Sequence, residues 1–262
     1  MNSTLSCIGI NYGTVEEVIS LLDRIEPYAS LAGRIGADLV QVWQDPSGAR
    51  LIFASRDGDR LDLLPSFAGG TSCQLAECTM WNPSVAYALL QDGTGQQLTA
   101  LTFAPEQHRW LQHAKLMPRA AANLVVLGID LQLFADARDF ENSAASLLQA
   151  DSTPEGLRLA GGSLLSYGPW GEQAEADAFC RLAAVVASAE CRRNLATGDP
   201  FTLVRGLLLG CEVELCLPAS VPVPQPGQVL AGLGYLVGRL AGVPYGHPAA
   251  LATSSAPVTD TC

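Results

Sequence analysis

The sequence predicts an α+β protein, in which an N-terminal antiparallel sheet of two related β-meanders with packing helices precedes a small β-rich, barrel-like C-terminal part. Three observations predict this class. A capped amphipathic segment covers 14–25, short apolar runs cover 38–67 and 74–103, and apolar runs with strand composition recur between 181 and 240. Short strands separated by Gly, Pro, Asp and Asn are typical of antiparallel β-structure.

The beginning of the chain predicts one strand and one helix. The apolar run from Leu5 to Ile10 has the length of a strand. Thr14, with Glu17 three residues later, forms the capping-box pattern of a helix start. Pro27 marks the end of the helix or a bend, because proline removes a backbone hydrogen bond. The apolar face of this helix consists of Val15, Val18, Ile19, Leu22 and Ile25.

The next segment predicts a three-stranded meander. Strands at 38–44 and 49–54 are separated by Asp45-Pro46-Ser47-Gly48, where proline second and glycine fourth are typical of a type I turn. Asp57-Gly58 then predicts a hairpin turn before a strand at 61–64, because Asp-Gly suits the tight turns of hairpins.

The following residues repeat this pattern, which indicates a degenerate internal duplication of 38–67 and 74–103. We expect the two meanders to join into one antiparallel sheet of about six strands. The matched positions, at offsets of 35 to 38 residues, are Trp43 with Trp81, Asp57 with Asp92, Leu61 with Leu98 and Ser66 with Thr102.

The middle of the chain predicts further elements and a boundary. Residues 105–117 predict a helix with proline in its first turn, 122–134 predict a strand, and alanine-rich 135–150 predict a short helix. Asp, Pro and Gly residues in 151–162 indicate a domain boundary or a long crossing loop. We therefore expect an α+β domain at 1–150.

A β-rich, barrel-like domain is expected at 151–243, followed by a tail at 244–262. Its shape is loosely similar to an oligonucleotide/oligosaccharide-binding barrel, an analogy of fold alone. Glycines at 232, 234 and 238 let a neighbouring backbone come close. Its expected strands are Arg181–Arg192, Phe201–Leu209, Glu212–Leu217 and Val229–Leu240.

Composition limits the partners and the compartment. Fifteen basic against 26 acidic residues give a net charge of −11, which argues against a nucleic-acid binder. That argument would fail if Arg181, Arg192, Arg193 and Arg205 gathered on one face. No apolar run is long enough to cross a membrane, and the N-terminus lacks the pattern of a signal peptide. Because the chain is large and shows no export signal, we expect a cytoplasmic protein with reduced, mostly buried cysteines. One lysine against fourteen arginines is typical of GC-rich bacterial genomes and predicts a bacterial protein.

No motif predicts a metal or a cofactor. His108 and His113 are five residues apart, so on a helix their side chains diverge, whereas helical zinc ligands use a spacing of three or four. The pairs Cys73/Cys78 and Cys211/Cys216 share a C-x4-C spacing, longer than most zinc knuckles. We expect these cysteines to be buried small hydrophobic residues.

The order strand, helix, three-stranded meander in 5–64 resembles the half-module of the vicinal-oxygen-chelate, glyoxalase-like metalloenzymes. In that family His, Gln or Glu ligands on the first and last strands of each module face a cup. Here the first strand offers Cys7 to Ile10, the fourth offers Asp62, and the second meander offers Glu77 and Gln91. Because no histidine occupies these positions, the resemblance implies a sheet without the family's metal.

The expected function is a non-catalytic binding or assembly module that acts through a protein partner or through self-association. An apolar chain with only 16% charged residues is typical of a protein whose surface is partly covered by another subunit. We expect neither nucleic acid nor a membrane as partner.

The alternative is a small-ligand-binding protein or a metal-free enzyme that uses the concave face of the N-terminal sheet. Its candidate ligand-binding residues are Trp43 and Trp81 as walls, with Arg50 and Glu77 as polar anchors. No catalytic residues are assigned.

Overall fold

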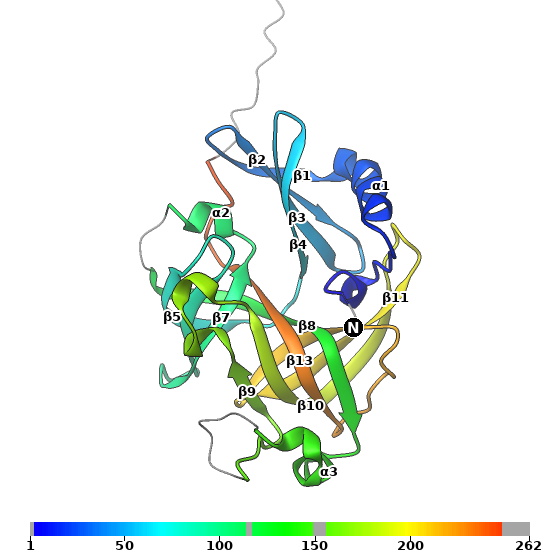
Figure 1. Ribbon diagram of the computed structural model, residues 1–262, viewed down its shortest axis with the longest axis vertical. Helices are drawn as coiled ribbons and strands as arrows, with labels where there is room; N and C mark the ends of the chain where they lie inside the picture. Colours follow the sequence, from blue (N-terminus) through cyan, green and yellow to red (C-terminus); the bar gives the residue numbers. More distant parts are fainter. Residues whose placement is uncertain (1–2, 114–116, 149–155, 248–262) are drawn as a thin grey trace, which may run out of the picture.

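The computed structural model describes residues 3–113, 117–148 and 156–247, which form a four-stranded antiparallel sheet and a nine-stranded mixed sheet. The small and large sheets lie toward opposite ends of an elongated molecule (Figure 1). Helix α1 (Val15–Ile25) lies beside the small sheet, and α3 (Ala137–Asn142) lies at the far end of the large sheet. This architecture fits the predicted α+β class loosely, with far more strand than helix.

The small sheet is a meander in which each strand pairs antiparallel with the next. The predicted turn at 45–48, after the second strand, is present. Its Asp45 carboxylate accepts a hydrogen bond from the Ser47 backbone N–H at 2.9 Å. Gly48 completes that turn at φ +96°, a conformation that favours glycine. The strands are β1 (Ser30–Ile35), β2 (Asp38–Gln44), β3 (Ala49–Arg56) and β4 (Asp59–Phe67).

Helix α1 confirms the predicted capping box. The Thr14 hydroxyl accepts from the Glu17 backbone N–H at 3.3 Å, and the Glu17 carboxylate accepts from the Thr14 N–H at 3.1 Å. The helix ends at Ile25, and Pro27 lies in the 3-10 turn η2 (Glu26–Tyr28) that follows. Its buried side chains, Leu21, Leu22 and Ile25, join the hydrophobic cluster between the two sheets.

The expected strand from Leu5 to Ile10 is wrong. Residues Ser6–Ile8 form the 3-10 turn η1, and Gly9 stops it with φ +74°. The segment is apolar because Cys7, Ile8 and Ile10 are buried between the sheets. A short apolar run reports burial and does not by itself distinguish a strand from a buried turn.

The large sheet closes on itself, because its order includes two additional pairings, β8–β13 and β10–β11. One ring of strand pairings runs β5–β6–β7–β13–β8 and back to β5. The second ring runs β10–β11–β12–β8–β13 and back to β10. Its strands are β5 (Cys73–Met80), β6 (Ala86–Gln91), β7 (Gln97–Pro105), β8 (Met117–Phe134), β9 (Ser163–Ser166), β10 (Phe179–Arg193), β11 (Pro200–Leu208), β12 (Cys211–Pro218) and β13 (Val229–Leu240).

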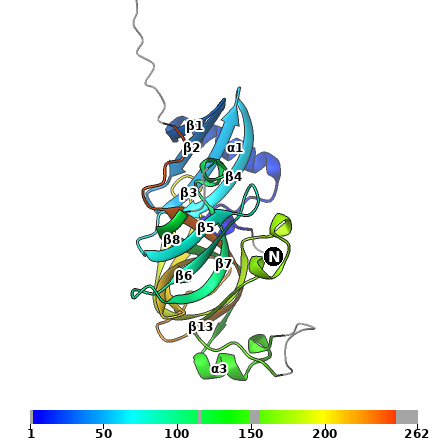
Figure 2. The same ribbon diagram turned by 90° about the vertical axis from the view of Figure 1, so that its left-hand side faces the viewer.

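The two rings share β8 and β13 and have the same pattern of pairings. In the first ring β5, β6 and β7 form a meander, β5 pairs antiparallel with β8, and β7 pairs parallel with β13. In the second ring β10, β11 and β12 form a meander, β10 pairs antiparallel with β13, and β12 pairs parallel with β8. Strand β8, which follows β5 to β7, therefore completes the second ring by pairing with β12. Strand β13, which follows β10 to β12, completes the first ring by pairing with β7, and Figure 2 shows β13 below β6 and β7.

The expectation that the two N-terminal meanders join into one sheet is wrong. Strand β4 ends at Phe67, and β5 pairs with β8 of the large sheet. The connection is fixed there because Glu214 accepts from the Gly70 backbone N–H at 2.8 Å and Asn123 donates to the Thr71 carbonyl at 2.7 Å. A Cβ atom on Gly69 would lie 2.0 Å from the Glu214 carboxylate, so a larger residue there would have to displace the group that binds Gly70. The proposed duplication of 38–67 and 74–103 stays a prediction.

The predicted helix at 105–117 is wrong in extent. Helix α2 covers only His108–Leu111, because Glu106 and Gln107 are bound to the end of β13: the Glu106 N–H donates to the Gly238 carbonyl, and Gln107 bonds both backbone groups of Leu240. The four predicted C-terminal strands correspond to β10 to β13. The second ring also contains β8, so its strands come from both sides of the boundary predicted near 150.

The predicted close approach of a neighbouring backbone is confirmed at Gly232, which faces the Asp130 carbonyl, whereas Gly234 and Gly238 face side chains. Cβ atoms at Gly232, Gly234 and Gly238 would lie within 2.1 to 2.7 Å of atoms of Asp130, Val126 and Leu124, all on β8. The rings enclose one hydrophobic cluster, and a second cluster fills the space between the two sheets. The predicted tail at 244–262 is described only to His247, and residues 248–262 lie outside the described residues.

A candidate ligand cleft between the small sheet and α2

An open cleft of about 660 Å³ lies where the small sheet meets α2 and the C-terminal segment. The turn between β1 and β2 forms one wall, ending at Asp38, and Arg56 at the end of β3 lies beside it. Trp110, His113 and His247 complete the lining. The volume lies within the range of small-molecule sites, roughly 300–1,000 Å³.

A chain of ion pairs positions the polar wall of the cleft. Asp38 accepts from Arg56 Nε at 2.6 Å and from Arg109 Nη1 at 2.8 Å. Arg109 Nε continues the chain to Asp62 at 2.7 Å, and His108 Nε2 lies 2.9 Å from the same Asp62 oxygen. These contacts fasten α2 to strands β2, β3 and β4.

The carboxylate of Asp62 is stabilised in its charged form. Burial by itself would raise its pKa, but hydrogen bonds from His108 and Arg109 and the charges of both residues outweigh burial and lower it. The other Asp62 oxygen accepts from the Ala54 backbone N–H at 3.0 Å. Because both oxygens are engaged, we infer a positioning role for Asp62.

Arg56 presents hydrogen-bond donors that the cleft leaves unused. Its Nε is bound to Asp38, and its side chain is 55% exposed. Among the described residues, neither Nη nitrogen of Arg56 has a hydrogen-bond partner. A guanidinium whose position is fixed at one nitrogen and open at the others can bind a carboxylate with two parallel hydrogen bonds.

Two aromatic rings form the apolar corner of the cleft. Trp110 and His247 meet edge to face, with centroids 4.9 Å apart and an interplanar angle of 89°. Trp110 is half-buried and His247 is exposed, both line the cleft, and aromatic ligands pack on such rings. The cleft therefore combines a planar apolar surface with a fixed positive charge.

The C-terminal segment is held in place by a buried polar cluster. The Tyr245 hydroxyl donates to Glu106 and accepts from Arg50 Nη2 at 2.9 Å. Glu106 also accepts from Ser66 Oγ at 2.7 Å, and burial followed by the Glu106 charge raises the pKa of Tyr245. His247 then pairs with the backbone of Arg34 in β1, which places its ring at the cleft.

The four candidate binding residues do not gather in this cleft, and whether they bind a ligand stays a prediction. Trp43 is buried in the cluster between the sheets, and Arg50 is buried against Glu106. Trp81 stacks on Tyr87 with centroids 4.6 Å apart. Glu77 is exposed at an irregular position of β5, with φ +52°.

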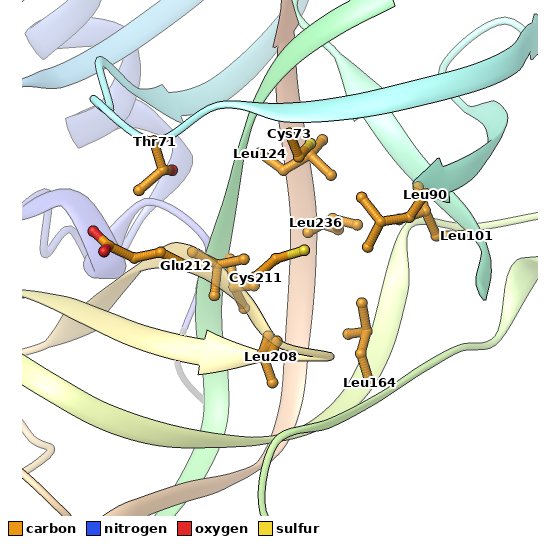
Figure 3. A pocket seen from close by; sticks show the side chains of 12 residues that line it. Thr71, Cys73, Leu90, Leu101, Leu124, Leu164, Leu208, Cys211, Glu212 and Leu236 are labelled. Carbon is orange, nitrogen blue, oxygen red and sulfur yellow. The ribbon is translucent and has the colours of Figure 1, made fainter. Parts of the chain in front are cut away.

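A second cavity lies inside the large sheet, where the two rings meet (Figure 3). Its walls are almost entirely apolar, and leucines from several strands point into it together with Cys73 and Cys211. It encloses only about 20 Å³, room for one water-sized sphere. This cavity is too small for an organic ligand.

The cysteines and the acidic groups that the structure describes do not assemble a metal site. The seven described cysteines are unpaired, and four of them are buried. Within the described parts of the chain, no group of three or more His, Cys, Asp or Glu side chains is placed to hold a metal ion. His108 faces Asp62, whereas His113 lines the cleft. None of the helices in the described ranges is long and apolar enough to cross a bilayer.

The four arginines that could have formed a nucleic-acid surface have separate partners. Arg181 donates to the Ala145 carbonyl, Arg192 to the Ser47 carbonyl and Arg193 to the Gly198 carbonyl. Arg205 lies 3.9 Å from the carboxylates of both Glu212 and Glu214.

Sequence reasoning missed Arg56, Trp110 and His247 as parts of one site. They come from three distant segments, and Arg56 has the features of an ordinary turn residue. The one available signal was the pairing of Trp110 with two histidines in 105–117. No protein-family model matches the chain, and no curated protein or solved structure matches it significantly.

Proposed function

We propose that the protein binds a small molecule in the cleft formed by Asp38, Arg56, Trp110, His113 and His247. The observation that carries the proposal is the fixed guanidinium of Arg56 with both Nη nitrogens open, beside the exposed ring corner of Trp110 and His247. Ligand sites in proteins are concave, mostly apolar, and supplied with a few well-placed polar groups. The cleft has each of these properties.

The position of these groups before binding supports the proposal. Arg56 is held by Asp38, which is itself held by Arg109, so the guanidinium loses little freedom when a ligand arrives. His247 is held by backbone pairing with Arg34. The proposal keeps the small-ligand alternative. It places the ligand in this cleft and not on the sheet face between Trp43 and Trp81.

The test is fluorine NMR of the full chain labelled with 5-fluorotryptophan. Four tryptophans give four signals, and a Trp110→Phe variant assigns the one at the cleft. The chain is titrated with small aromatic and aliphatic acids, amides and amines. We expect at least one compound to shift the Trp110 signal saturably, while the signals of Trp43 and the 80% exposed Trp170 stay in place. Failure of every compound to move Trp110 would overturn the proposal.

A second candidate is an assembly module, the expected function of the chain. Val15, Ile19, Tyr28 and Leu31, on α1, η2 and β1, are 45% to 81% exposed although they are apolar or aromatic. Exposed apolar side chains in neighbouring elements favour contact with another protein surface. Light scattering after size exclusion at micromolar concentration tests self-association. A dimer that dissociates in Val15→Asp/Ile19→Asp would support it, and a monomer at all concentrations would contradict self-association.

A further inference from the structure

The charges around the cleft select the sign of its ligand. Asp38 has each carboxylate oxygen bound to a guanidinium, and its side chain is only 8% exposed. Asp62 is likewise engaged by Arg109 and His108. The charges of both acids are therefore already paired with arginines of the protein itself.

Arg56 supplies two open hydrogen-bond donors at the cleft, its Nη1 and Nη2 nitrogens. Its guanidinium pKa is raised first by the hydrogen bond and then by the charge of Asp38, and Asp57 adds a weaker effect of the same sign. The guanidinium therefore stays charged at any pH at which the protein folds. Two donors in one plane match the two oxygens of a carboxylate.

The ring corner selects the shape of the ligand. The Trp110 and His247 rings are perpendicular, so a flat ring can pack against one of them while its edge meets the other. An aliphatic ring of the same size has no flat face and gains less from this geometry.

On the basis of the proposed function, we infer that the ligand is a small aromatic carboxylate whose ring packs on Trp110 and whose carboxylate is bound by Nη1 and Nη2 of Arg56. The two Nη donors of one guanidinium match the two oxygens of a carboxylate, which carries a single negative charge. A phosphate monoester carries about −1.5 to −2 charges at this pH and is matched less well.

The test uses 2-naphthoate as the probe and the fluorotryptophan-labelled chain. We expect 2-naphthoate to shift the Trp110 signal and to bind about tenfold or more tightly than 2-naphthamide, cyclohexanecarboxylate or phenyl phosphate. Arg56→Gln should lower the affinity for 2-naphthoate about tenfold and leave the affinity for 2-naphthamide unchanged. Arg205→Gln is the matched control, because its side chain is 54% exposed and remote from the cleft. The remaining three signals report whether each variant is folded.

Each result separates the inference from the proposed function. Equal affinity for 2-naphthoate and 2-naphthamide, or an unchanged affinity in Arg56→Gln, would overturn the aromatic-acid inference and leave the cleft as a ligand site. Tighter binding of phenyl phosphate would also overturn it in favour of a phosphate ligand. A Trp110 signal that responds to no compound would overturn both.

Discussion

Arg50 of β3 and Glu106, which follows β7, form an ion pair of 3.1 Å in which the two side chains are 5% and 0% exposed. This contact joins the small sheet to the large sheet through a buried charge pair. Tyr245 bonds both partners, so the C-terminal segment that carries His247 to the cleft depends on the same pair. The link between the two sheets and the geometry of the cleft therefore share one set of residues.

Removing the charge of Glu106 should be strongly destabilising. Glu106→Gln leaves the Arg50 guanidinium buried without a counter-charge, and we expect a loss of about 3–5 kcal/mol in the free energy of unfolding. The double variant Arg50→Met/Glu106→Leu should lose less, because no charge remains buried. Equilibrium unfolding in urea measures both. A Glu106→Gln protein as stable as the wild type would show that the pair does not hold the sheets together.

The close contact at Gly246 should tolerate no side chain. A Cβ atom on Gly246 would lie 2.6 Å from the Arg34 backbone nitrogen, so Gly246→Ala must push the C-terminal segment away from β1. We expect a loss of about 1–3 kcal/mol and a shifted Trp110 fluorine signal, since His247 packs on that ring. Gly93→Ala is the control, because a Cβ atom on Gly93 would meet no other atom within 4 Å. Equal effects of the two variants would refute the contact.

Asp62 should contribute to stability toward acid. Its pKa is lowered in the folded protein, so its contribution is present above the unfolded pKa, near 3.9, and is lost as the pH falls below that value through the folded pKa. We expect Asp62→Asn to cost about 1–3 kcal/mol at pH 7 and to reduce the loss of stability between pH 4 and pH 2. Urea unfolding at several pH values measures this. The exposed Glu172→Gln serves as control, and an identical acid profile in Asp62→Asn would exclude the effect.

The cysteines should differ sharply in reactivity. Burial raises the pKa of Cys7 to about 12, that of Cys180 to about 12 and that of Cys78 to about 11, whereas Cys191 is exposed. In a Cys262→Ser background at pH 8, an aromatic disulfide reagent should modify Cys191 first, and Cys191→Ser should remove that phase. Rapid modification of Cys7 or Cys180 in the folded chain would contradict their burial.

The buried thiols of Cys7 and Cys180 should lower the free energy of unfolding at alkaline pH. Their pKa values are raised in the folded protein, so their contribution is complete below the unfolded value, near 9, and declines as the pH rises above it. Urea midpoints between pH 8 and pH 10.5 test this. A Cys7→Ala/Cys180→Ala variant should show a shallower decline than the wild type, and an equal decline would assign the effect to other groups.

Local chemistry was predictable from the sequence, and long-range pairing was not. The Thr14–Glu17 cap, the Asp45 turn and the extent of β13 each depend on residues close together in the chain, and each was predicted. The choice of β8 as the partner of β5 depends on Glu214 and Asn123, which hold the connection at Gly70 and Thr71. The pattern of residues within 68–72 does not indicate which strand will pair with β5.

The cleft could not be predicted for a related reason. Arg56 and Asp38 look like strand-end residues, and His247 lies in a segment expected to be a tail. Their common site also needs the C-terminal segment, which Tyr245 binds to Arg50 and Glu106 and His247 pairs with Arg34. Of the residues proposed from sequence, Arg50 belongs to the supporting cluster of the cleft, whereas Trp43 is part of a hydrophobic core.

The exchange of β8 and β13 between the two rings has a consequence for synthesis on the ribosome. The first ring needs β13, which ends at Leu240, so the strands made first remain open until nearly the whole chain has emerged. At about 5–20 residues per second, the free edge of β7 waits on the order of ten seconds for β13. A nascent chain of this protein is therefore a natural substrate for chaperones that cover unpaired strands.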